Sequence, residues 1–149
     1  MPRMIFVNLP VTDLDRSIAF YRSVGAEQNM QFSDATAAMM SVSTEINVML
    51  LTHDKYRQFT SKPIADAHAS SQVLLCLSAD GRDDVDAIVG RAANAGGAPD
   101  PSATQDHGFM YGRSFEDPDG HHWEVMWMDV SAFAAQPAGE AADTAAAAA

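Results

Sequence analysis

The sequence predicts an α+β protein made of two βαβββ modules, which form paired, curved mixed sheets around a central cleft. The order strand, helix, glycine stop and terminal hairpin occurs twice, at an offset of about 71 or 72 residues judged by Gly25 against Gly96 or Gly97. With 149 residues, 47% of them hydrophobic, the chain can bury one core. Four strands with a helix on one face leave the other face free, so we expect a ligand cleft between the modules.

The first module is expected over about residues 4–52. Residues 4–9 are rich in Ile, Phe and Val, which predicts a strand. Residues 12–26 have an apolar stripe at helical spacing, with Thr12 or Asp13 to cap the helix and Gly25 to end it. Three further strands are expected near residues 28–32, 37–43 and 46–52, the last two joined as a hairpin.

A polar linker at residues 53–71 leads to the second module, expected over about residues 72–129. The strand at 73–78 is dense in leucine and valine, and Asp83 is expected to cap the helix that follows. Strands are then predicted near residues 102–105, 109–115 and 122–128. Both modules belong to one domain, residues 1–130, and the alanine-rich segment 131–149 is predicted to be a disordered tail.

The most informative segment is FEDPDGHHWEV, at residues 115–125. Asp117, Pro118 and Gly120 hold the first, second and fourth places of a type I turn, where an Asp side chain bonds the backbone and proline presets φ. The chain is therefore expected to reverse here and to begin a second strand.

Side chains alternate along that second strand, so Glu124 shares a face with His122 and Met126. Trp123 and Trp127 are expected on the opposite face, against the second helix. The register with the preceding strand decides the role of Glu124. If the small residues Ser114 and Gly112 lie across from it, a ligand has room; if Arg113 does, a structural ion pair is the better interpretation.

Composition excludes several classes of partner. The net charge of −11, from 20 acidic and nine basic residues, argues against binding to nucleic acid or an anionic membrane, and favours a small-molecule ligand. No stretch approaches the length of a membrane helix, and the start lacks the features of a signal peptide, so a cytoplasmic location is expected. Cys76, the only cysteine, lies between leucines, which predicts an inert buried thiol.

The order FVNLPVTDLDRSIAFY near the start, the two modules and FEDPDGHHWEV near the end resemble the vicinal oxygen chelate superfamily. That group includes glyoxalase I, extradiol dioxygenases, and the bleomycin and fosfomycin resistance proteins. The resemblance covers residues 4–129. It implies a glyoxalase-like fold with a small-molecule site in the cleft, and the pairing of two chains into a homodimer to complete such a cleft.

The metal-dependent members of that superfamily take ligands from four strands, and this sequence matches only part of the set. Phe6 stands where they carry His or Gln, and Leu50 where glyoxalase I carries Glu. The third position falls on Gln72 or Leu74, and only Glu124 matches fully. Catalytic metal sites need about three protein ligands, so the resemblance implies that the usual metal, and any other cofactor, is absent.

Three functions remain open. The first is a metal-independent protein that binds a small molecule, with Glu124 as general acid or base in an apolar cleft. The second is a metal-dependent lyase similar to lactoylglutathione lyase, or an extradiol dioxygenase, with Ni, Zn or Fe on Glu124 and Gln72 or a nearby histidine. The third is a non-catalytic protein that sequesters a drug. The residues expected to line the cleft with Glu124 are Phe6, Leu50, Leu74, Gly112, Ser114, His122 and His107.

Overall fold

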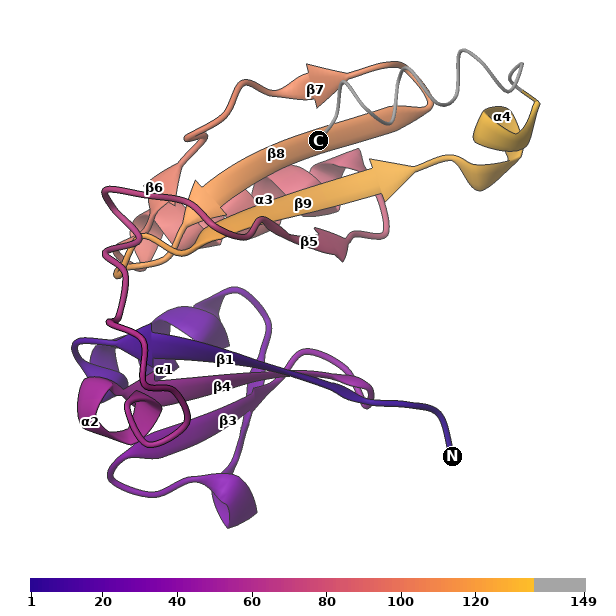
Figure 1. Ribbon diagram of the computed structural model, residues 1–149. Coiled ribbons are helices and arrows are strands. Elements are labelled where there is room, and N and C mark those ends of the chain that lie inside the picture. The colour runs from indigo at the N-terminus through magenta and orange to yellow at the C-terminus, as the bar shows by residue number, and fades with distance from the viewer. Residues whose placement is uncertain (136–149) are drawn as a thin grey trace.

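The computed structural model describes residues 1–135 as two βαβββ modules joined by a linker (Figure 1). A short helix, α4 (Val130–Ala134), follows the second module. The expected tail at residues 131–149 lies outside the described residues from residue 136 onward. Among residues 1–135, no helix has the length and apolar composition of a membrane span.

The first module contains a four-stranded sheet of order β1-β4-β3-β2. Its elements are β1 (Ile5–Val11), α1 (Leu14–Ser23), β2 (Glu27–Asn29), β3 (Ala37–Ser41) and β4 (Ile46–Thr52). β1 and β4 are parallel and the other pairs are antiparallel. The side chain of Asp13 caps α1 by accepting a hydrogen bond from the Arg16 N–H at 3.0 Å, as expected.

The second module follows the same order with one additional strand, in a five-stranded sheet in which β5, β9, β8 and β6 are successive neighbours and β7 also pairs with β8. Its elements are β5 (Leu75–Ser78), α3 (Arg82–Asn94), β6 (Ala98–Pro99), β7 (Gln105–Asp106), β8 (Met110–Glu116) and β9 (His122–Met128). Gly25 and Gly96 follow the two helices with φ of 105° and 98°. They lie 71 positions apart (96 minus 25), so the repeat expected from the sequence is confirmed.

Three local expectations differ from the structure. β2 ends at Asn29, because the side chain of Asn29 caps a 3-10 helix, η1 (Met30–Phe32). Gly81 is the N-cap of α3, without a side-chain bond, and Asp83 lies in the first turn. No strand forms at residues 102–104 of the one expected near 102–105, because the short strands β6 and β7 lie before and after them, and the linker includes α2 (His53–Tyr56).

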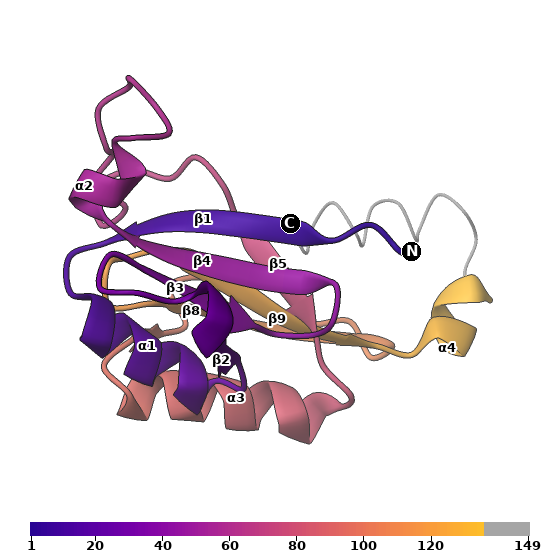
Figure 2. The ribbon, with the colours of Figure 1, turned by 90° about the horizontal axis from the view of Figure 1, so that it is seen from below.

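The two modules share one hydrophobic core. α1 and α3 lie next to each other on one side of the molecule (Figure 2). Phe20 of α1 packs on Phe115 of β8, with 5.9 Å between ring centroids, and Tyr21 packs edge-on against Trp123 of β9. Side chains from the first helix therefore complete the core of the second module.

A buried hydrogen-bond network links the modules at the predicted turn. The Tyr21 hydroxyl donates to Asp117 Oδ2 at 2.6 Å and accepts from Trp123 Nε1–H at 3.0 Å. Asp117, only 2% exposed, also accepts from the N–H groups of Asp119 and His121. Burial raises the pKa of the Asp117 carboxyl and, together with the charge of Asp117, that of the Tyr21 hydroxyl.

Contacts of Asp119 and Gly120 hold the rest of the turn in place. The Asp119 carboxylate accepts from the N–H and the hydroxyl of Thr12, at 3.0 and 2.7 Å. Gly120 has φ of 90°, and a Cβ there would lie 2.7 Å from the backbone nitrogen of His68 in the linker. The turn therefore holds the start of α1, the linker and the β8–β9 hairpin together.

Replacement of Tyr21 by Phe should lower the free energy of unfolding by about 2 kcal/mol, because it leaves the Trp123 N–H and the Asp117 carboxyl without a buried partner. Chemical denaturation monitored by tryptophan fluorescence measures the change. Tyr56→Phe removes a hydroxyl with no hydrogen bond in the described structure and should cost less than about 0.5 kcal/mol. Equal losses in the two variants would contradict the role of the network.

Candidate functional site

The face of the second sheet that points away from α3 contains the candidate site. On β8 and β9, Ser114 lies opposite Glu124 and Gly112 lies opposite Met126. On β5, Cys76 lies on the other side of Glu124. The register that leaves room beside Glu124 is therefore the one present.

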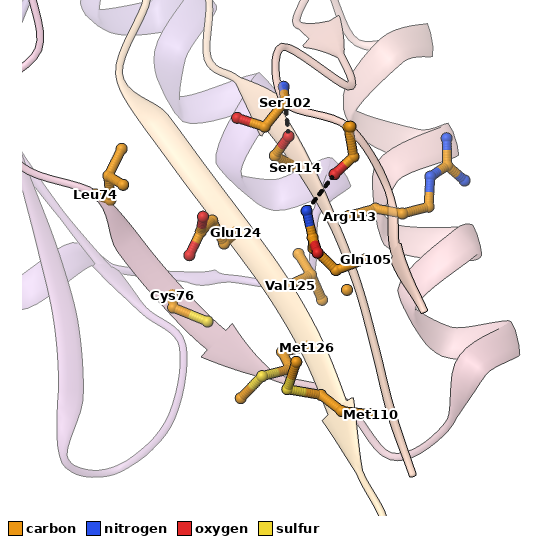
Figure 3. Close-up of a pocket in the computed structure, with 12 residues that line it drawn as sticks. Leu74, Cys76, Ser102, Gln105, Met110, Arg113, Ser114, Glu124, Val125 and Met126 are labelled. Carbon is orange, nitrogen blue, oxygen red and sulfur yellow. Dashed lines mark hydrogen bonds between the residues drawn. The ribbon is translucent and has the colours of Figure 1, made fainter. Parts of the chain in front are cut away.

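These side chains line a cavity of about 140 Å³ (Figure 3). The wall is formed by Leu74, Cys76, Ser102, Ala103, Gln105, Met110, Gly112, Arg113, Ser114, Glu124, Val125 and Met126. In Figure 3, Glu124 projects from β9 on the same side as Leu74 and Cys76, whereas Arg113 extends away toward α3. The pocket thus combines one carboxylate with a largely apolar and sulfur-containing wall.

The surroundings of Glu124 leave its carboxylate available. It forms no hydrogen bond or ion pair with any residue in the described range 1–135. Ser114 is oriented by its own bond, in which its Oγ accepts from the Ser102 N–H at 3.1 Å. A Cβ at Gly112 would lie 3.6 Å from its nearest atom, the Val125 carbonyl oxygen, which is ordinary van der Waals contact, so no neighbour would have to move to admit it.

Arg113 is held on the opposite face of the sheet. Its guanidinium binds the Asp100 carboxylate at 2.6 Å and the Asp86 carboxylate at 2.9 Å. Hydrogen bonding to Asp100, followed by that to Asp86, raises the pKa of Arg113 above its usual value. The pair between Arg113 and Glu124 considered from the sequence is therefore not the one present, and Arg113 pairs instead with aspartates on the α3 side.

Cys76 differs from its expected position. It was predicted to be buried, but it is exposed, because the leucines on either side of it point toward α3 while Cys76 points to the open face. Partial burial raises the pKa of its thiol, and the neighbouring Glu124 charge raises it further. The thiol is thus accessible but mostly protonated at neutral pH.

Only some of the residues expected to line the cleft lie beside Glu124. Leu74 lines the pocket with Glu124, Gly112 and Ser114. Phe6 lies on β1 of the other module and is 48% exposed. Leu50 is fully buried beside Val48 in the core, because alternation along β4 turns both of them toward α1; the expectation that Leu50 lines the cleft is therefore corrected.

Two expected residues line a second cavity, of about 520 Å³, between the modules and the linker. Gln72 and His122 lie there with Asn8 and Pro10 of β1 and Glu116 of β8. The Nε2 atom of His122 is buried without a hydrogen-bond partner, and so is that of His107, which lines neither cavity. Gln72 and Glu124 thus belong to different cavities.

The residues around Glu124 do not fit the usual catalytic metal. Within residues 1–135, no three His, Cys, Asp or Glu side chains are grouped so that they could hold an ion. The direct neighbours of Glu124 across the strands are Cys76 and Ser114. A divalent metal in a catalytic site takes about three protein ligands, most often with imidazole or carboxylate among them.

Sequence reasoning missed Cys76 and Met110 as pocket residues. Strand alternation was a sufficient signal for Cys76, since it shares the parity of Leu74 and pairs with Glu124. Met110 is two residues before Gly112 and so on the same face. The leucines on either side of Cys76 favoured a core assignment for it over a place in a pocket wall.

Comparisons with known proteins agree with this architecture. The family model described as Glyoxalase/Bleomycin resistance protein/Dioxygenase superfamily matches residues 3–125. A comparison with curated protein sequences finds no match.

Solved structures similar to this chain include a hypothetical protein, SA1046, from S. aureus, with 24% identity and a TM-score of 0.71 over 85% of this chain and 94% of that one. A genomically encoded fosfomycin resistance protein, FosX, from Listeria monocytogenes has 18% identity and a TM-score of 0.61, covering 85% and 91%. A lactoylglutathione lyase from Agrobacterium tumefaciens has 22% identity and a TM-score of 0.61, covering 83% and 92%.

Alkylation of Cys76 should report the charge of Glu124. Because that charge raises the pKa of the thiol, Glu124→Gln should move the pH midpoint of the reaction with iodoacetamide downward and raise the rate at pH 7.5 or so. Cys76 is the only cysteine, so mass spectrometry follows this thiol alone. Glu27→Gln, at an exposed site on β2, should leave the midpoint unchanged. An unchanged midpoint in Glu124→Gln would contradict the effect of the Glu124 charge on the Cys76 thiol.

Proposed function

This chain belongs to the glyoxalase/bleomycin resistance protein/dioxygenase superfamily, and we propose that it binds a small organic molecule in the pocket that contains Glu124. The observation that carries the proposal is a carboxylate with no hydrogen-bond or ion-pair partner among residues 1–135, set in a concave, mostly apolar wall. A pocket with few polar groups that converge on one space is the usual form of a small-molecule site.

The wall indicates the chemistry of the ligand. Leu74, Met110 and Met126 offer apolar surface, and methionines adapt to varied shapes and favour aromatic rings. Glu124 accepts hydrogen bonds and attracts positive charge. The ligand therefore combines a compact apolar body with an ammonium or another hydrogen-bond donor, and the net charge of −11 favours the approach of a cation.

Binding in this proposal needs no metal ion, because the donor set around Glu124 does not supply the ligands that the usual catalytic metal requires. If the bound molecule reacts, Glu124 is the pocket group positioned to accept its proton and return it. A carboxylate contributes to such a step only when it lies within hydrogen-bond reach of the reacting atom, and the small side chains of Ser114 and Gly112 leave that approach open.

Three probes of similar size test the expected ligand chemistry: benzylammonium, benzyl alcohol and benzoate. Benzylammonium should bind about tenfold more tightly than benzyl alcohol, since a charge-assisted hydrogen bond to Glu124 contributes about 1.4 kcal/mol more than a neutral one. Benzoate should bind most weakly. Ligand-observed NMR titrations give the three dissociation constants.

Variants locate the binding of these probes. Glu124→Gln should remove the preference for benzylammonium, and Gly112→Leu should weaken all three probes by filling the pocket. Glu27→Gln is the matched control and should bind as the unmodified protein does. Equal affinity for the three probes, or unchanged binding in Gly112→Leu, would overturn the proposal.

A further inference from the structure

The second cavity, between the two modules and the linker, has a wall suited to a ligand of its own. Its volume is about 520 Å³, and it is lined by β1, by the linker up to β5 and by the turn ends of β8 and β9. In Figure 1, the linker runs from α2 past the first module to β5 of the second. Cavities of this size at the interface between two units are common sites for small organic molecules.

The strand register places a second carboxylate in this cavity. Glu116 lies opposite His122, and this pair is two residues closer to the turn than the pair of Ser114 and Glu124. Because strand side chains alternate, Glu116 and His122 point to the same open face as Glu124. Both line the second cavity, whereas Glu124 lines the first. The Glu116 carboxylate forms no hydrogen bond or ion pair with any residue in the range 1–135.

Lys62 adds a positive charge from the linker. Its side chain is exposed, lines the second cavity, and forms no ion pair with any of the residues that the structure describes, 1–135. The other Lys or Arg side chains that line described cavities are already engaged, because Arg22 donates to Gln28 and Arg113 binds two aspartates. The Lys62 ammonium is therefore available to a ligand in a way that those guanidinium groups are not.

The rest of the wall combines apolar surface with one unsatisfied polar atom. Pro63, Ile64 and Val73 line the cavity, and Val73 is 55% exposed. The Nε2 atom of His122 is buried and has no hydrogen-bond partner among residues 1–135. Buried polar atoms nearly always have a partner in the protein or in ordered water, so this nitrogen marks a wall that the protein alone does not satisfy.

We propose that the second cavity binds a small zwitterion, a molecule that carries an ammonium group and a carboxylate on one compact apolar body. Glu116 accepts from the ammonium and Lys62 donates to the carboxylate, each through a charge-assisted hydrogen bond. The flexible stem of Lys62 lets its ammonium follow the ligand. A zwitterion is neutral overall, so the net charge of −11 does not repel it as it repels a simple anion. The site does not depend on Glu124, which lies in the other cavity.

Three ring compounds test the site in the full-length protein: 4-(aminomethyl)benzoate carries both charges, and benzylammonium and benzoate carry one each. Titrations followed by ¹⁵N NMR give the dissociation constants and identify the amide signals that move. The zwitterion should shift the amides of Thr60, Lys62 and Gln72, and it should bind there about tenfold or more tightly than either parent, since it alone pairs with both charges. L-Phenylalanine, compared with phenethylammonium and 3-phenylpropanoate, repeats the test with the two charges on adjacent atoms.

Variants that remove one charge locate the site. Lys62→Gln and Glu116→Gln should each weaken the binding of the zwitterion about tenfold, because each leaves one ligand charge without its partner. Lys55→Gln is the matched control, since this lysine of α2 lies over the Phe59 ring and does not line the cavity, and it should bind as the unmodified protein does. Benzylammonium should still shift the amide of Glu124 in all three variants.

Two results would overturn the zwitterion site. The first is that neither zwitterion binds more tightly than the compounds that carry one of its charges. The second is tighter binding that is unchanged in Lys62→Gln or in Glu116→Gln, or that shifts only amides around Glu124. Neither result affects the binding of benzylammonium beside Glu124, and loss of that binding alone would contradict the proposed function and leave the zwitterion site standing. The two failures are therefore distinguishable.

Discussion

The hydrogen bond between the buried Tyr21 hydroxyl and Asp117 is the interaction on which the rest of the molecule depends. It joins the helix of one module to the turn of the other, and Trp123 extends it into the second sheet. A buried pair of this kind is costly to break, because each partner would be left without water or a substitute. The same turn starts β9, so the position of Glu124 follows from the contact that unites the modules.

The second constraint is the alternation of β8 and β9 across a fixed register. It sends Arg113 toward Asp86 and Asp100 beside α3, and it sends Ser114 to the face of Glu124. The cation and the lone carboxylate are thereby kept on opposite faces of one sheet. A slip of one residue would bring Arg113 to Glu124 and fill the pocket. The register of the β8–β9 hairpin therefore determines whether the pocket forms.

Much of this could be predicted from local patterns. The repeat, the Asp13 cap, the turn at Asp117 and the alternation around Glu124 depend on near neighbours in the chain, and these predictions are confirmed. Errors arose where tertiary context decides. Leu50 and Cys76 both lie in apolar strands, and only the placement of α1 and α3 shows which face of each strand is covered. The second cavity, formed by linker and strands far apart in sequence, has no local signal.

The central claim is that Glu124 is the polar anchor of a small-molecule pocket on the open face of the second sheet. A crystal structure of the protein soaked with benzylammonium tests this most directly. We expect the ammonium nitrogen within hydrogen-bond distance of the Glu124 carboxylate and the ring against Leu74, Met110 and Met126. Density for the probe only in the cavity beside Gln72 and His122, or Glu124 paired with Arg113, would contradict the account.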